Sequence, residues 1–259
     1  MRKNHIFLHI PKNGGNTLHS ILKRFYPSDK TFYINDKKIN DFLKMSPELR
    51  REISLLRGHM SFGLHKHLYG ESDYFTLLRK PESRVISYYN YTLSRHPNQL
   101  YNVLQKKEFS FHDFVTNVKA GNVHNAQIRF ISGINDKEEF MLEKALENID
   151  KHFSFVGLLE KYDESLIYLK NLYNWKIPYY VKRNVTKKGK KDLGIKKLTL
   201  EIIKEKNNGD YILYRKMESV FKKKISNLSS FNNDLNKLNF YNSVYNTFLF
   251  NCGRKLKII

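Results

Sequence analysis

The order of apolar runs along the first part of the chain predicts strands and helices that alternate. Residues 5–10 form an apolar run of strand length that ends at a proline and a glycine turn. Residues 17–25 then place apolar side chains at i, i+3, i+4 and i+7, the spacing of one helix face. Extended runs at 52–56 and 74–78, and a helix that begins after Pro81, includes Leu93 and ends before His96, continue the alternation. Such an order favours a parallel sheet with helices on its faces.

The remainder of the chain has mostly helical spacing. Helices are expected over 111–118, 125–132, 137–149, 163–174, 210–228 and about 233–251, with one more strand at 153–158 and a basic loop at 182–197. We find no repeat, no linker and no clear boundary. The prediction is an α/β fold with a central parallel β-sheet flanked by helices, in one domain over 1–259 whose part from about 199 to 259 is a helical C-terminal extension.

Composition narrows the class of protein. Lys and Arg number 46 against 25 Asp and Glu, a net charge of +21, which favours anionic partners such as nucleotides, sulfated substrates, nucleic acid or a membrane surface. The single Cys252 excludes a disulfide scaffold and a Cys-rich zinc site. No apolar run approaches the about 20 residues that cross a bilayer. We therefore expect a cytoplasmic protein, with a removed leader or anchor left open.

The segment 11–17 has the features of an anion-binding turn. Backbone N–H groups and a helix N-terminus can converge there on a phosphate, while Lys12 adds a charge and Thr17 a hydroxyl. The lysine precedes the glycines, unlike the P-loop order G-x-x-x-x-G-K-[ST], which argues against an ordinary P-loop kinase. Taken alone, such a segment is more often only a turn.

Read as one string, residues 9–17 (HIPKNGGNT) resemble the 5′-phosphosulfate-binding segment of sulfotransferases of the heparan-sulfate 2-O-sulfotransferase kind, whose usual form is His-Ile-Pro-Lys-Thr-Gly-Gly-Thr-Ser. Asn13 and Asn16 stand where the usual form has threonine. The resemblance implies a P-loop-NTPase-like sheet and a donor, 3′-phosphoadenosine 5′-phosphosulfate (PAPS), with adenosine 3′,5′-bisphosphate (PAP) as product. The implied donor-binding residues are Lys12, Asn13, Gly14, Gly15, Asn16 and Thr17.

Two further segments look like parts of the same family. Residues 77–89 are similar to its 3′-phosphate segment, which implies that Arg79 and Ser87 hold the 3′-phosphate. Residues 57–63 are similar to a Gly-His-x-x-Phe/Tyr stretch, which implies that His59 is the general base beside catalytic Lys12. Further similar fragments lie at 125–133, 155–165 and 184–186, so the resemblance spans about 5–186.

The resemblance predicts sulfuryl transfer from PAPS to a hydroxyl, in a carbohydrate acceptor that can itself be anionic, without a metal. Arg129 is a candidate acceptor contact, and Lys187 and Lys188 are candidates for covering the nucleotide. His65 and His67 are alternative bases. They are not expected to bind a metal, because they lie two residues apart and the sequence has no cluster of Cys or carboxylate residues near them.

Glu82 and Arg84 are expected to make ordinary surface contacts on their helix.

Two other functions remain as alternatives to sulfuryl transfer. A nucleotide-dependent phosphotransferase would need Mg²⁺ and a carboxylate after a strand, and no such carboxylate is evident in the sequence. A non-enzymatic basic protein could bind nucleic acid or another polyanion, although no nucleic-acid module is recognisable.

Overall fold

A computed structural model describes residues 3–35, 38–94, 99–106, 109–119, 121–181 and 195–255. The described residues form one sheet of five strands: β1 (Asn4–Leu8), β2 (Thr31–Ile34), β3 (Leu55–Gly58), β4 (Ser72–Leu78) and β5 (Phe153–Leu158). The strand order is β2-β3-β1-β4-β5, and all neighbouring strands run parallel. This confirms the expected α/β fold with a central parallel sheet.

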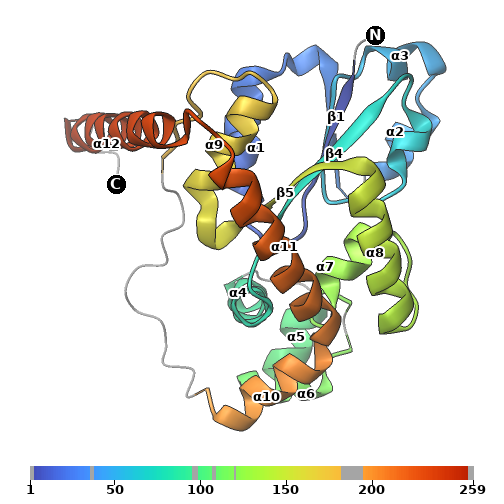
Figure 1. The fold of residues 1–259 in the computed structure, drawn as a ribbon. Helices are drawn as coiled ribbons and strands as arrows, with labels where there is room; N and C mark the ends of the chain where they lie inside the picture. Colours follow the sequence, from blue (N-terminus) through green and yellow to red (C-terminus); the bar gives the residue numbers. More distant parts are fainter. Residues whose placement is uncertain are drawn as a thin grey trace.

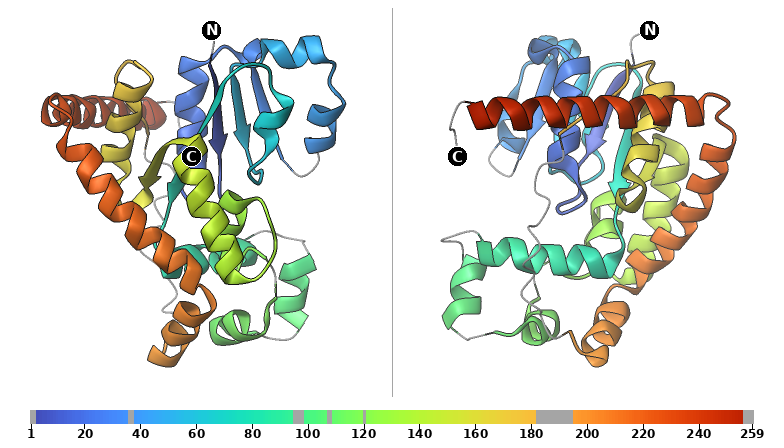
Figure 2. Two further views of the ribbon diagram at one scale, coloured as in Figure 1. Left: turned by 45° about the vertical axis from the view of Figure 1, so that its right-hand side comes forward. Right: turned by 90° about the vertical axis from the view of Figure 1, so that its left-hand side faces the viewer.

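Helices cover both faces of the sheet. The helices are α1 (Gly15–Phe25), α2 (Ile39–Lys44), α3 (Pro47–Glu52), α4 (Pro81–Ser94), α5 (Gln99–Lys106), α6 (Phe111–Asn117), α7 (Ala126–Ser132), α8 (Glu138–His152), α9 (Tyr162–Leu172), α10 (Lys197–Lys206), α11 (Asn208–Ser226) and α12 (Phe231–Lys255), with 3₁₀ turns η1 (Ser28–Lys30), η2 (Leu64–His67) and η3 (Leu159–Lys161). Figures 1 and 2 show α1 and α9 on one side of the sheet and α8 on the other. Beyond the carboxyl ends of the strands lies a group of helices that includes α4, α5, α6 and α10 (Figure 1).

Two clusters of buried apolar side chains hold these layers together. The larger lies against the sheet and includes Leu8, Phe75 and Leu213, all fully buried. The smaller lies among α4, α6 and α10, with Phe114 and Ile203 at its centre. Burial of apolar surface is the main favourable term in folding. The C-terminal helices contribute to both clusters, because α10 carries Ile203 and α11 carries Leu213. The expectation of a single domain stays a prediction.

The structure corrects the sequence prediction near the third strand. Residues 52–56 were expected to be a strand, but α3 occupies Pro47–Glu52 and β3 begins only at Leu55. The Ser46 hydroxyl accepts from the Leu49 N–H at 3.4 Å, and Pro47 is the first helical residue, so the sequence does carry a helix start there. The edge strand β2 was not predicted, since its four residues are too few to show a clear alternation.

Two further expectations concern particular segments. The basic loop at 182–197, with Lys187, Lys188 and the 184–186 fragment, falls mostly on residues 182–194, outside the described residues. Within the part of the chain that the structure describes, none of the helices combines the length and apolarity needed to cross a bilayer.

Candidate active site

The candidate site lies where the chain changes direction across the sheet. From β1 the chain builds β2 and β3 on one side, then returns to add β4 and β5 on the other. Ligands of open parallel sheets bind outside the carboxyl ends of the strands at such a switch point. The segment 9–17 follows β1, His59 follows β3 and Arg79 follows β4. The fold thus gathers the three segments that the sequence analysis singled out.

The loop between β1 and α1 is a close-packed backbone turn. Gly14 has a left-handed φ of 76° and caps α1 without a side-chain hydrogen bond. A Cβ on Gly15 would lie 2.0 Å from His9 Nε2, so the imidazole of His9 packs directly on the glycine backbone. The first N–H groups of a helix have no partner within the helix, and they attract anions. The loop and the start of α1 therefore form a backbone cradle of the kind that binds a phosphate or sulfate group.

Lys12 lies on the side of the cradle that faces α4. Its Nζ is 4.1 Å from the centre of the Tyr91 ring. Ser87 lies four residues before Tyr91 on α4, and such residues share one helix face. Ser87 is therefore on the same face of α4 as the aromatic ring that contacts Lys12. Tyr91 was missed by the sequence analysis, since nothing local marks it as a neighbour of Lys12.

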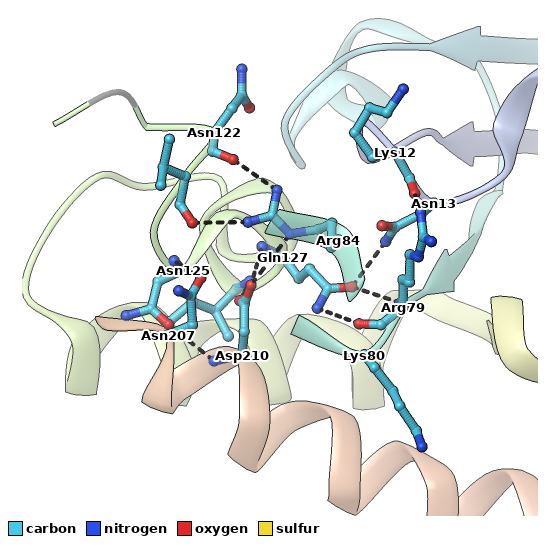
Figure 3. Close-up of polar contacts among 12 residues, drawn as sticks. Lys12, Asn13, Arg79, Lys80, Arg84, Asn122, Asn125, Gln127, Asn207 and Asp210 are labelled. Carbon is cyan, nitrogen blue, oxygen red and sulfur yellow. Dashed lines mark hydrogen bonds and ion pairs between the residues drawn. The ribbon is translucent and has the colours of Figure 1, made fainter. Parts of the chain in front are cut away.

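Arg79 connects the cradle to the end of β4. Its Nη1 donates to the Lys12 carbonyl oxygen at 3.0 Å, and Figure 3 shows the two residues side by side. Burial lowers the pKa of Arg79, and Glu160 opposes that shift. Arginine keeps its charge in proteins and carries five N–H donors. The half-buried guanidinium can therefore serve an anionic ligand while it remains tied to the cradle.

The remaining cradle side chains differ in their orientation. Asn13 is 1% exposed, and its Nδ2 donates to the Leu77 carbonyl at 2.8 Å and to Gln127 Oε1 at 2.9 Å. The amide of Asn13 is thus turned into the protein and holds the loop in place. Asn16 is exposed, and Thr17 is half-buried at the start of α1.

His59 stands at the same edge of the sheet. Its ring is stacked on that of His9, with centroids 4.3 Å apart, and its Nδ1 lies 3.0 Å from the His9 carbonyl oxygen. A carbonyl only accepts, so Nδ1 carries the hydrogen and the lone pair is on Nε2, the tautomer that a base needs.

Two buried histidines support the ring of His59. His19 Nε2 lies 3.1 Å from His9 Nδ1. Burial lowers the pKa of His9 well below its ordinary value and that of His19 to about 3, so both rings are neutral near neutral pH. The sequence analysis missed their role, because only the fold brings them together. Among the described residues, no group of three or more His, Cys, Asp or Glu is arranged to hold a metal ion.

Comparison with known proteins identifies the family of this chain. The model of the sulfotransferase family matches residues 2–227. The chain belongs to the sulfotransferase family. A crystal structure of mouse sulfotransferase SULT7A1 complexed with PAP is similar at 9% identity and a TM-score of 0.40, over 79% of this chain and 63% of that one. The chain thus spans less than two thirds of that protein, and no curated protein matches it.

The alternative bases in this family member lie apart from the cradle. His65 Nδ1 is 3.0 Å from the Tyr74 hydroxyl, which also accepts from the His65 N–H at 3.1 Å, and the ring leans against His152. His67 meets the edge of Phe42. Of the three candidates, only His59 stacks on the histidine of the cradle.

The expectation that Arg84 makes surface contacts is wrong. Its side chain is 0% exposed, and it donates to the backbone carbonyls of Asn122 and Val123 at 2.8 and 3.2 Å. Its Nε lies 4.0 Å from Oδ2 of Asp210 on α11, which is also 0% exposed (Figure 3). Glu82, half-buried one turn before Ile86, likewise accepts from a tyrosine of α11. Helix α4 is therefore covered by α11. The sequence pattern of α4 alone does not predict this contact.

Arg129 lies close to this buried pair. It is half-buried, burial lowers its pKa, and Asp210 opposes that shift. A Cβ on Gly121 would lie 2.7 Å from its Nη1, so the glycine leaves space for the guanidinium. The role of Arg129 as an acceptor contact stays a prediction.

Gly15→Ala should weaken nucleotide binding and also destabilise the fold. The added methyl would overlap the His9 ring and force the cradle or the ring to move, a strain of about 1–3 kcal/mol. We expect PAP affinity to fall at least about tenfold, measured by calorimetry, with the melting temperature recorded in parallel. Gly63→Ala is the control. With a φ of 122°, an alanine there strains the backbone, but its Cβ would have no neighbouring atom within 4 Å to displace. Unchanged PAP affinity in Gly15→Ala would show that the cradle is not the nucleotide site.

Proposed function

We propose that this chain transfers the sulfuryl group of PAPS to a hydroxyl group of a carbohydrate acceptor. The observation that carries the proposal is the convergence of a backbone cradle, Lys12, Arg79 and His59 on one sheet edge at the switch point between β1 and β4. Membership of the sulfotransferase family supports the type of reaction. The net charge of +21 favours an acceptor that is itself anionic.

The donor would be held through both of its phosphate groups. The backbone of residues 14–16 at the start of α1, with Lys12, would hold the 5′-phosphosulfate. Arg79 at the end of β4 and Ser87 on α4 would hold the 3′-phosphate, since a guanidinium binds phosphate through a fork of donors. The absence of a Cβ at Gly15 lets the ring of His9 pack against the backbone of the cradle and hold it in place.

The reaction would be an in-line displacement at sulfur. The acceptor oxygen forms the new S–O bond while the bond from sulfur to the bridging oxygen breaks, and that electron pair stays on the phosphate of the departing PAP. The acceptor proton moves to Nε2 of His59, whose Nδ1 is held by the His9 carbonyl. Lys12 offsets the negative charge that grows on the bridging oxygen. The neutral rings of His9 and His19 leave the base free of a neighbouring positive imidazolium.

The two alternative functions have less support. A phosphotransferase of the Mg²⁺ kind needs a carboxylate after a strand, and the residues that directly follow β1, β3 and β4 are His9, His59 and Arg79. Glu160 follows β5, but its carboxylate accepts from the Lys80 N–H at 2.9 Å and from the Tyr214 hydroxyl at 3.0 Å. A polyanion-binding protein would have no use for a close-packed cradle. A thermal-shift comparison separates the three functions, because a bound ligand raises the melting temperature. PAP should stabilise a sulfotransferase, ATP with Mg²⁺ a phosphotransferase, and an oligonucleotide a polyanion-binding protein.

Arg79→Ala should weaken PAP binding far more than binding of adenosine 5′-monophosphate. A hydrogen bond to a charged group contributes about 1.5–3 kcal/mol, so about one to two decades of PAP affinity should be lost. Ser87→Ala should show the same preference with a smaller loss. Calorimetry with both nucleotides is the measurement, and Arg51→Ala, an exposed arginine of α3, is the control. Equal losses for the two nucleotides would refute the assignment of the 3′-phosphate to Arg79.

A further inference from the structure

The side chain of Gln127 joins two separate segments of the candidate site. Gln127 lies in the first turn of α7 and is 0% exposed. Its Oε1 accepts from the Arg79 N–H at 2.9 Å, and its Nε2 donates to the Arg79 carbonyl at 2.9 Å. The same Oε1 accepts from Asn13 Nδ2 at 2.9 Å (Figure 3). One amide therefore holds both the end of β4 and the loop that follows β1.

The direction of each of these bonds is determined by the backbone. The Arg79 N–H can only donate and its carbonyl can only accept, so the Gln127 amide has one possible orientation. Asn13 must then donate to Gln127, and its second donor reaches the Leu77 carbonyl at 2.8 Å. The contacts form a connected set, although the buried Oδ1 of Asn13 has no hydrogen-bond partner among the described residues. An amide at position 127 fits this set, and a hydrocarbon of the same length does not.

The position of Gln127 is fixed in turn by α11. The Asp210 carboxylate accepts from the Gln127 N–H at 3.1 Å and from the Ile128 N–H at 2.8 Å. Asn125, at the N-cap of α7, makes no side-chain cap, so Asp210 supplies the carboxylate that this helix start needs. The buried Arg84 lies beside Asp210. The start of α7 is therefore held from behind by a buried ion pair, while Gln127 reaches forward to the site.

We propose that Gln127 is a positioning residue that sets the distance between the cradle and Arg79, and with it the preference for a nucleotide that carries both a 5′- and a 3′-phosphate. The proposal rests on the proposed function, since it concerns the same nucleotide site. The cradle would hold one end of such a ligand and Arg79 the other, so a change in their spacing acts on the 3′-phosphate selectively. In an active site, misplacement of a group by about 1 Å is enough to lower the reaction rate by up to about a hundredfold.

The test compares the buried amide of Gln127 on α7 with the buried amide of Asn148 on α8. Gln127→Met keeps the length of the side chain but removes all three bonds. Asn148→Leu is the matched control, because Asn148 is 2% exposed and its Nδ2 donates to the carbonyls of Ile131 and Ser132, at the opposite end of α7. Both variants should lose stability. Only in Gln127→Met should the ratio of PAP affinity to adenosine 5′-monophosphate affinity fall, by at least about tenfold. Calorimetry with both nucleotides is the measurement.

A second measurement does not depend on the nucleotide. In Gln127→Met, amide hydrogen exchange should become faster in residues 12–16 and 79–80, which lose their tie, and should stay at the parent rate there in Asn148→Leu. If Gln127→Met does not fold, Gln127→Glu replaces it, since a carboxylate keeps the acceptor but removes the donor to the Arg79 carbonyl and places a buried negative charge against that oxygen.

The outcomes separate this proposal from the proposed function. If the parent protein binds neither nucleotide, the proposed function fails, and the exchange measurement still decides whether Gln127 ties the two segments. If the parent prefers PAP and Gln127→Met keeps that preference, the positioning role is overturned. Parent exchange rates in residues 12–16 and 79–80 of Gln127→Met would overturn it as well.

Discussion

Lys12→Ala should abolish most turnover while PAP binding stays measurable. Charge on the bridging oxygen grows mainly in the transition state, and an interaction that strengthens there acts on kcat rather than on ground-state affinity. The loss of one preorganised electrostatic contact costs about 10²–10³ in kcat. The measurement is the rate of sulfuryl transfer from PAPS to a panel of carbohydrates, with PAP affinity from calorimetry.

The backbone of Lys12 requires a second variant. Its φ is +72°, a conformation that costs a non-glycine residue energy, so alanine keeps the backbone strain of lysine and glycine relieves it. Lys12→Gly removes the amine and relieves the strain, whereas Lys12→Ala removes the amine alone. If the amine carries the effect, both variants lose turnover equally. Parent-like turnover in either variant would show that the Lys12 ammonium has no part in the chemistry.

His59→Ala should lower kcat by about 10²–10⁴, the contribution of a positioned general base. In the parent protein, kcat/KM should rise with pH as the imidazole loses its proton, because only the neutral ring can accept the proton of the acceptor hydroxyl. That rise should be absent in the variant. The measurement is the pH profile of both proteins. His59→Asn tests the same point with a side chain that can still donate to the His9 carbonyl but has no Nε2.

His65 and His67 provide the controls for this prediction. His65 is held by Tyr74 and His152, and His67 contacts Phe42, so neither ring lies in the histidine stack beside the cradle. His65→Ala and His67→Ala should therefore keep the pH profile of the parent. A large loss in His65→Ala beside normal turnover in His59→Ala would transfer the role of base to His65.

Local pattern predicted the parts of the molecule whose structure depends on near neighbours. The fifth strand lies at 153–158 as expected, and the turn after the first strand was evident from its glycines. The candidate residues on the three strand ends could also be found, because a parallel sheet gathers the ends of its strands at one edge. Their chemistry is written in short, contiguous segments.

The sequence could not predict the contacts that join distant segments. Arg84 was expected on the surface, since the apolar spacing of its helix gives no sign that α11 covers it. The stacking of His59 on His9 and the contact of His9 with His19 depend on three elements coming together. Gln127 belongs to a fragment that resembles the family, yet its bonds to Arg79 and Asn13 became visible only in three dimensions. Such contacts depend on the fold as a whole, so a short sequence window does not contain them.

The carboxylate of Asp210 also bears on when the site can form during protein synthesis. The proposed nucleotide-binding residues lie between 12 and 87, and translation delivers them first. The helix start that carries Gln127 has its buried carboxylate supplied by α11, which leaves the ribosome much later. A nascent chain that ends before residue 210 has the cradle sequence but lacks the anchor behind it. The proposed nucleotide site would thus be completed late in translation, after the C-terminal helices have docked.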